Sequence, residues 1–168
     1  CFARVETNGG ASEQVNLLYG ENPNQAVRTF TKPFNEAGIQ THMLDRGLNG
    51  LRMNPVPADV RELMYKVKKA QGTDITRIFD GLNDVRNIAP SIRYAKAAGM
   101  IAQATMCITH SEVHTAEYYI NMAEQLIAEG AQEICLKDMA GIGRPETLAK
   151  IVKAIKLSHP DITIQYHG

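Results

Sequence analysis

The sequence lacks the features that define several common classes of protein. It contains no CxxC pair, and its three cysteines (positions 1, 107 and 135) are widely spaced, which excludes a zinc ribbon and a disulfide framework. No apolar run approaches the roughly 20 residues that cross a membrane. The 18 Lys and Arg residues balance 18 Asp and Glu residues, so neither nucleic acid nor an anionic membrane is an expected partner. These absences indicate a protein of the reducing cytoplasm.

The length of 168 residues accommodates one domain with a sizeable core. The chain starts at Cys1 within a strand-like segment, so we expect no signal peptide and interpret the chain as part of a longer one. No low-complexity linker interrupts it. We therefore expect a single domain over residues 1–168.

Strand-like and helix-like segments alternate along the chain. Short apolar runs predict strands at 1–6, 39–45, 74–80, 101–109, 132–138 and 162–167. Helical periodicity predicts helices at 12–19, 23–37, 58–71, 88–98, 115–128 and 145–157. Ser12 is the expected N-cap of the first helix, Pro33 is expected to interrupt the second, and Pro145 suits the first turn of the last. Glycines end four of the helices and lead into strands, which predicts parallel strands with right-handed crossovers.

Polar residues at the C-terminal ends of the strands distinguish two parallel architectures. They are Glu6, Asp45-Arg46, Asp80, Thr109, Lys137-Asp138 and His167. A (β/α)8 barrel gathers its chemistry at such strand ends, whereas an open doubly wound sheet concentrates it behind a glycine-rich phosphate loop. Neither GxGxxG nor GxxxxGK[ST] occurs. We therefore predict an α/β fold of the TIM-barrel type, incomplete here with about six consecutive β/α units; the first and last units are expected from outside this sequence or from a partner chain.

The stretch Ile134–Gly141 contains the strand end with the strongest functional signal. Lysine and aspartate are costly to bury, so a strand that ends on Lys137-Asp138 ends either at a functional site or in solvent. Adjacent strands lie about 4.8 Å apart, so Lys137 and His167 can reach one ion if both face the barrel mouth. Histidine is the commonest metal ligand, and lysine becomes a ligand when CO₂ converts it to a carbamate. The alternative is that both are polar residues at strand ends.

Other polar residues allow both a functional and a structural interpretation. The planar fork of Arg46 suits a carboxylate or an enolate oxygen, or it forms a salt bridge with a neighbouring strand-end carboxylate. Asp84 is expected to cap the helix that follows it. Thr105, Cys107 and Thr109 alternate along one strand, where packing is the structural alternative. The remaining histidines show no metal spacing and are interpreted as surface or loop residues: His42, His110, His114 and His159.

Six motifs occur in an order that resembles one enzyme family. They are Gly9-Gly10-Ala11, Glu21-Asn22-Pro23, Met43–Asn49, Arg77–Asn87, Val113-His114-Thr115 with Glu117-Tyr118-Tyr119, and Cys135–Gly141. Over nearly its whole length the chain resembles the carboxyltransferase domain of the biotin-dependent family of pyruvate carboxylase, oxaloacetate decarboxylase alpha subunit and transcarboxylase. The resemblance implies an eight-stranded barrel with a divalent metal (Zn, Mn or Co) in its mouth.

The resemblance also implies roles for individual residues. Lys137 is the carboxylated lysine ligand of the metal, and His167 is the first histidine of a His-x-His pair. The second histidine and an aspartate ligand are expected outside this chain, which leaves two of the family's four protein ligands here. Arg46 binds the carboxylate and enolate of the substrate, and we assign Arg46 and Lys137 as catalytic. Gly10, Gln14 and Thr109 are assigned, with Arg46, to substrate binding.

The implied reaction is biotin-dependent carboxyl transfer between carboxybiotin and a 2-oxo acid such as pyruvate, with oxaloacetate decarboxylation as its reverse, a lyase reaction. Biotin is expected on a separate carboxyl carrier domain or subunit, and the enzyme is expected to be a homo-oligomer. The metal and Arg46 are expected to stabilise the enolate where negative charge develops in the transition state.

Three departures from the family pattern leave the identity of the acyl acceptor open. Asn8 replaces a tryptophan, Gln14 replaces an aspartate, and Arg52-Met53 replace a Gly-Tyr pair. In pyruvate-using relatives the last two positions help the arginine to shape the pocket. Two alternatives to carboxyl transfer remain at this point: a biotin-independent, metal-dependent acyl-CoA lyase or synthase of the same barrel superfamily, and an inactive fragment with an incomplete site.

Overall fold

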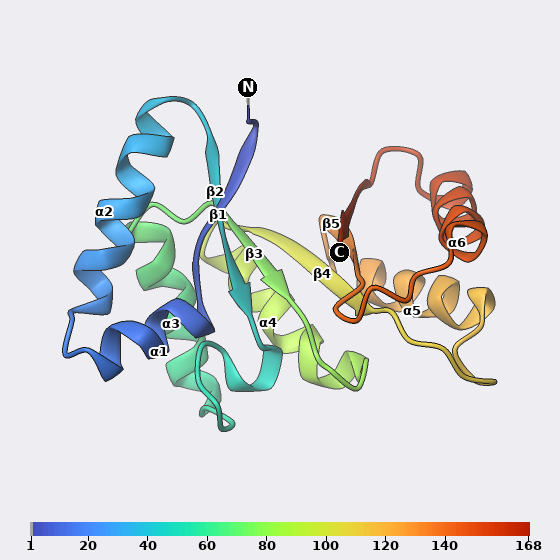
Figure 1. Ribbon diagram of the computed structural model, residues 1–168, viewed down its shortest axis with the longest axis horizontal. Helices are drawn as coiled ribbons and strands as arrows, with labels where there is room; N and C mark the ends of the chain where they lie inside the picture. The colour runs from blue at the N-terminus through green and yellow to red at the C-terminus, as the bar shows by residue number, and fades with distance from the viewer. Residues whose placement is uncertain (1) are drawn as a thin grey trace.

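The structure, a computed structural model, describes residues 2–168, so the first residue of the predicted strand 1–6 lies outside the described part. Strands and helices alternate along this part of the chain (Figure 1). The strands are β1 (Arg4–Gly9), β2 (Gln40–Asp45), β3 (Ile75–Ile78), β4 (Ile101–Cys107), β5 (Glu133–Lys137) and β6 (Thr163–His167). The helices are α1 (Gly10–Leu18), α2 (Pro23–Glu36), α3 (Ala58–Ala70), α4 (Val85–Ala97), α5 (Ala116–Ala128) and α6 (Pro145–Ser158), and a short 3-10 helix, η1 (Gly47–Asn49), follows β2.

The strands form one parallel sheet whose order is the order of the chain, β1-β2-β3-β4-β5-β6. A doubly wound sheet has a point at which the strand order reverses, and this sheet has none. The sheet also curls, because Arg4 on β1 reaches both carboxylate oxygens of Glu133 on β5 at 2.7 Å. In a flat sheet, strands four places apart lie about 19 Å apart. Sequential order and curl are those of six consecutive units of a (β/α)8 barrel, as predicted.

The two faces of the curled sheet differ in chemistry. The outer face packs against the helices and forms the apolar core, to which strands and helices both contribute: Met43, Ile78, Met106, Ile134 and Leu136 from the strands, and Tyr65, Ile88, Ile92, Leu126, Ile151 and Ile155 from the helices. Burial of one such large apolar side chain contributes about 1.5–3 kcal/mol. Side chains alternate between the faces of a strand, so Gln103 and Thr105 on β4 point to the inner face, which we call the lumen. The lumen is therefore polar.

Several local predictions about helix ends are confirmed. The Asp84 carboxylate caps α4 by accepting a hydrogen bond from the Arg86 backbone N–H at 2.9 Å. Pro145 occupies the first turn of α6. The predicted glycines after α2, α3, α4 and α5 all have positive φ. Within residues 2–168, no helix is both long and apolar enough to cross a membrane.

Two local predictions about helices are wrong. β1 runs on to Gly9 and α1 begins at Gly10, so Ser12 lies inside the first turn and is not the N-cap. Its hydroxyl instead accepts a hydrogen bond from the Gly9 backbone N–H at 3.1 Å, which secures the turn from strand to helix. Pro33 does not interrupt α2, which continues to Glu36. Pro33 lies in the last turns of the helix, where Ala37 N–H still closes on the Pro33 carbonyl at 3.2 Å.

Candidate active site at the mouth of the barrel

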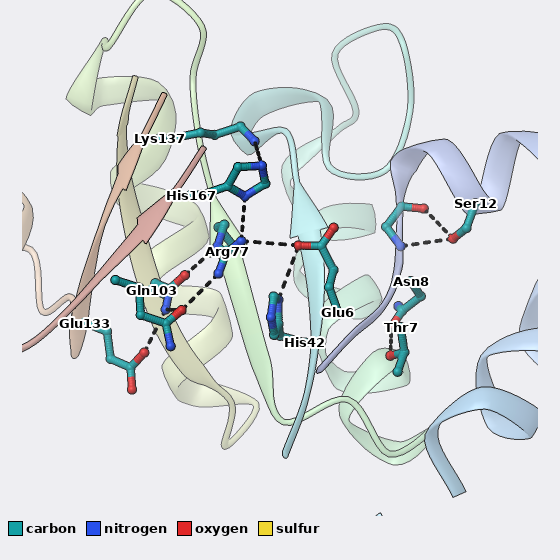
Figure 2. Close-up of polar contacts among 12 residues, drawn as sticks. Glu6, Thr7, Asn8, Ser12, His42, Arg77, Gln103, Glu133, Lys137 and His167 are labelled. Atoms are coloured by element: carbon teal, nitrogen blue, oxygen red, sulfur yellow. Dashed lines mark hydrogen bonds and ion pairs between the residues drawn. The ribbon is translucent and has the colours of Figure 1, made fainter. Parts of the chain in front are cut away.

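Lys137 and His167 end the neighbouring strands β5 and β6 and are paired in register. Figure 2 shows the two side chains turned toward each other, with Lys137 Nζ 3.4 Å from His167 Nε2. Lys137 is 4% exposed, and its ammonium nitrogen lies 5.4 Å from the centre of the Phe79 ring. Of the two alternatives for this strand end, the structure excludes the one in which Lys137 emerges into solvent.

Burial dominates the protonation chemistry of this pair. It lowers the pKa of Lys137, which favours the neutral amine over the ammonium. Burial also lowers the pKa of His167, and the positive charges of Lys137 and Arg77 lower it further. A neutral amine is the nucleophilic form of lysine, and it is the form that can take up CO₂.

Arg77, near the end of β3, lies at the centre of a polar network beneath Lys137 and His167. Its guanidinium lies across the lumen, and it is 6% exposed (Figure 2). Nη1 lies 2.8 Å from His167 Nδ1 and 3.3 Å from Glu6 Oε2. Nε donates to Gln103 Oε1 at 2.6 Å, and Nη2 donates to Gln165 Oε1 at 2.9 Å. One side chain thus connects β3 to β1, β4 and β6.

This network was not predicted from the sequence, although the strands contain polar residues that indicate it. Arg77, Gln103 and Gln165 interrupt the apolar pattern in the middle of strands, where a buried strand is expected to be apolar. Glu133 also belongs to this polar network. It accepts a hydrogen bond from Gln103 at 2.8 Å in addition to the two from Arg4.

His42 was predicted to be a surface or loop residue, and this prediction is wrong. It lies in β2, is 7% exposed, and faces the lumen, with Nδ1 3.5 Å from Glu6 Oε2. Burial, followed by the positive charges of Arg77 and Arg4, lowers its pKa to about 4. The ring is therefore neutral at pH 7 and forms no ion pair with Glu6. His110 is exposed and His114 half-buried in the loop after β4, and His159 ends α6, as predicted.

Arg46 directly follows β2, and its guanidinium lies over Gly10. A Cβ atom placed on Gly10 would come within 2.7 Å of both Cζ and Nη1 of Arg46. Nη1 also donates to the Arg52 carbonyl at 3.3 Å and contacts the Met53 sulfur at 3.5 Å. Among the described residues no carboxylate forms a salt bridge with Arg46, so the structural alternative of a salt bridge is not realised. The guanidinium is available to bind an anion.

Gln14 and Thr109 are placed less directly. Gln14 lines an apolar cleft of about 770 Å³ between α1 and the loop that precedes α3, together with Arg52 and Met53. Thr109 lies two residues beyond β4, where its backbone N–H donates to the Tyr119 hydroxyl at 2.9 Å. The structure therefore brings Arg46 to Gly10 and Lys137 to His167, and it places Gln14 beside the loop that holds Arg46. It gives Thr109 no contact with any of them.

Two aspartates at strand ends have structural partners. Asp138, after β5, accepts hydrogen bonds from the Ile142 and Gly143 backbone N–H groups at 2.9 and 2.8 Å. These bonds lower its pKa although burial opposes them, and Asp138 therefore orders the loop before α6. Asp45 is fully buried at the end of β2 and accepts hydrogen bonds from the hydroxyls of Tyr65 and Thr76. Burial raises its pKa to about 6 in spite of these bonds.

The residues present can hold part of a metal site. Within the described residues no group of three His, Cys, Asp or Glu side chains converges. Lys137 and His167 converge at 3.4 Å, which lets a lysine carbamate oxygen and an imidazole nitrogen bind one ion. The donor pair fits two positions of a divalent metal site.

Sequential parallel strands and a curled sheet define a segment of a (β/α)8 barrel, and its polar C-terminal strand ends place the candidate site at the barrel mouth. No family model matches the sequence. The sequence does match individual proteins. The chain is 39% identical over 153 residues to methylmalonyl-CoA carboxyltransferase 5S subunit of Propionibacterium freudenreichii, a match that covers 90% of this chain and 30% of the relative. It is 33% identical to pyruvate carboxylase of Schizosaccharomyces pombe, over 97% of this chain and 14% of the relative.

The solved structures agree with these relatives. The carboxyl transferase domain of Rhizobium etli pyruvate carboxylase with pyruvate superimposes with a TM-score of 0.90 at 27% identity, over 98% of this chain and 28% of that one. The chain belongs to the biotin-dependent carboxyltransferase family of pyruvate carboxylase and transcarboxylase, as its motifs predicted. It spans less than a third of the length of these relatives.

Proposed function

We propose that the protein to which this chain belongs transfers a carboxyl group between carboxybiotin and a 2-oxo acid. The observation that carries the proposal is the pair of Lys137 and His167, 3.4 Å apart at the barrel mouth in a chain of this family. Pyruvate carboxylase and oxaloacetate decarboxylase chemistry are the two directions of this reaction. The names of the relatives favour carboxyl transfer over the biotin-independent lyase alternative.

In the proposed mechanism Arg46 binds the substrate. Its planar fork donates hydrogen bonds to the carboxylate and the enolate oxygen of a 2-oxo acid, and it has no carboxylate partner to give up. Gly10 allows the guanidinium to lie close to α1, and Gln14 and Thr109 are proposed to contact the substrate. A group fixed in advance where negative charge develops stabilises the transition state more than the ground state.

Lys137 and His167 are proposed to hold the divalent metal, Lys137 as its carbamate. When bound there, the metal would supply positive charge that stabilises an enolate. Burial favours the neutral amine of Lys137, which supports carbamate formation. The remaining ligands and the other two barrel units are proposed to come from outside this chain. Biotin on a carrier domain or subunit, a homo-oligomeric assembly and a cytoplasmic location complete the proposal.

Replacement of Lys137 in the full-length protein tests this proposal. Decarboxylation of oxaloacetate and carboxylation of pyruvate are measured with the biotinylated carrier, for the wild type and Lys137→Ala. Loss of a metal ligand is expected to reduce kcat by more than about 100-fold. Lys150→Ala is the matched control, because Lys150 is exposed on α6 and pairs there with Glu146. A wild type inactive with both substrates overturns the proposed function, whereas an active Lys137→Ala overturns only the ligand assignment.

A further inference from the structure

Both ring nitrogens of His167 face groups that are usually hydrogen-bond donors. Arg77 Nη1 lies 2.8 Å from Nδ1, and Lys137 Nζ lies 3.4 Å from Nε2 (Figure 2). A guanidinium can only donate. Nδ1 must therefore accept, and in a neutral ring the proton sits on Nε2, the nitrogen that faces Lys137. The neutral amine of Lys137 can accept from that N–H.

This arrangement differs from the one that a metal-bound histidine needs. A metal held at Nε2 requires a lone pair on that nitrogen, so the ring proton must be on Nδ1. Histidine ligands almost always donate that second N–H to a carboxylate, a carbonyl or a water. Arg77 cannot accept it, so the hydrogen bond between Arg77 and His167 must be replaced when a metal binds.

Glu6 is the carboxylate best placed to become the new partner. Its Oε2 lies 3.3 Å from the same Arg77 Nη1 that now contacts His167, and its side chain is 37% exposed. Glu133, a second carboxylate that faces the lumen, already accepts two hydrogen bonds from Arg4 and one from Gln103.

Arg77 can release His167 without losing its own place. Its Nε and Nη2 remain bonded to Gln103 and Gln165 at 2.6 and 2.9 Å. Only Nη1 has to change its partner.

We propose that Glu6 is the positioning residue of His167: on metal binding it accepts the Nδ1–H, in place of the hydrogen bond that Arg77 now donates to Nδ1. The inference rests on the proposed role of His167 as a metal ligand. The proton on Nε2 is lost to solvent and one is gained at Nδ1, so the ring stays neutral. Glu6 then fixes the ring plane and aims Nε2 at the ion.

Calorimetric titration of the metal-free full-length protein with Mn²⁺ tests the proposal. Glu6→Ala is expected to weaken Mn²⁺ binding by about 10- to 100-fold, the usual effect of losing such a partner. Glu6→Gln keeps an acceptor oxygen and is expected to restore part of the affinity. Glu62→Ala removes the same charge from a partly exposed site on α3, where Glu62 pairs with Lys66, and is expected to bind Mn²⁺ as the wild type does.

Different results of the Mn²⁺ titration would contradict different parts of the proposal. Equal affinities of Glu6→Ala and Glu62→Ala overturn the role of Glu6, and so does a Glu6→Gln variant as weak as Glu6→Ala, because only charge then matters. A wild type that binds no Mn²⁺ overturns the metal role of His167 and this inference with it. If thermal unfolding shows that Glu6→Ala is not folded, Glu6→Met, which fills similar space without an oxygen, takes its place with the same expected loss.

Discussion

Gly10→Ala is expected to impair the enzyme through the position of Arg46 rather than through folding. The added Cβ would lie 2.7 Å from Arg46 Cζ and Nη1, and 3.2 Å from Nε. Non-bonded carbon atoms prefer about 3.5–4.0 Å, so the guanidinium must move by roughly 1 Å. The α1 backbone at Gly10 has no positive φ, and alanine is the better helix former by about 1 kcal/mol. Stability should therefore be unchanged or slightly higher.

The expected functional effect follows from the size of that movement. A misplacement of about 1 Å in a group that orients the substrate can reduce the rate about 100-fold. Steady-state kinetics with the 2-oxo acid as varied substrate should thus show a fall of about 10- to 100-fold in kcat/KM. Gly81→Ala is the matched control, because a Cβ there meets nothing within 4 Å and the backbone has no positive φ.

Two results would refute this reasoning. One is a Gly10→Ala variant with wild-type kcat/KM, since the guanidinium would then not depend on the space above Gly10. The other is a full additional loss when Gly10→Ala is combined with Arg46→Ala. Residues that act as a unit are not additive, so the double variant should be no worse than Arg46→Ala alone.

Three further predictions concern stability. The pKa of Asp45 rises from 3.8 to about 6 through burial, so the native protein binds more protons than the unfolded chain between these pH values. Its stability falls as pH rises through that window, and urea unfolding should show Asp45→Asn gaining about 2 kcal/mol on the wild type from pH 4 to 7. Asn83→Ala should lose about 2–4 kcal/mol in the same assay, because Asn83 (φ 57°) pairs with both backbone groups of Cys107; wild-type stability would contradict this. Thr115→Ala removes the N-cap bond to the Tyr118 N–H and should lower Tm by a few degrees, for about 1 kcal/mol.

Local sequence signals were sufficient where neighbouring residues decide the structure. The cap at Asp84 and the proline at the start of α6 depend on contacts within a few residues, and both were predicted. Ser12 was misassigned because β1 continues through a register irregularity to Gly9, and this continuation depends on pairing with β2. Strand ends are set by the neighbouring strand, so local pattern locates them poorly.

The candidate site also contains some residues whose placement could be predicted from the sequence and others whose placement could not. Lys137 and His167 could be placed side by side from the sequence, because parallel strands bring their C-terminal ends to one edge. Asp138 was grouped with Lys137 as a possible site residue, yet its carboxylate bonds the loop before α6. The two residues are adjacent in sequence, but successive side chains near a strand end point in opposite directions, and only one faces the lumen.

By itself, the sequence determined the alternation of strands and helices, their parallel arrangement, the family, and the set of polar strand ends, because these depend on periodicity, capping and motif order. Only the tertiary structure decided which polar groups meet across the lumen. Arg77 reaches Glu6 and His167, and Arg4 reaches Glu133, because the sheet curls until strands far apart in the chain face one another. That curl is a property of all six strands together, and no single segment encodes it.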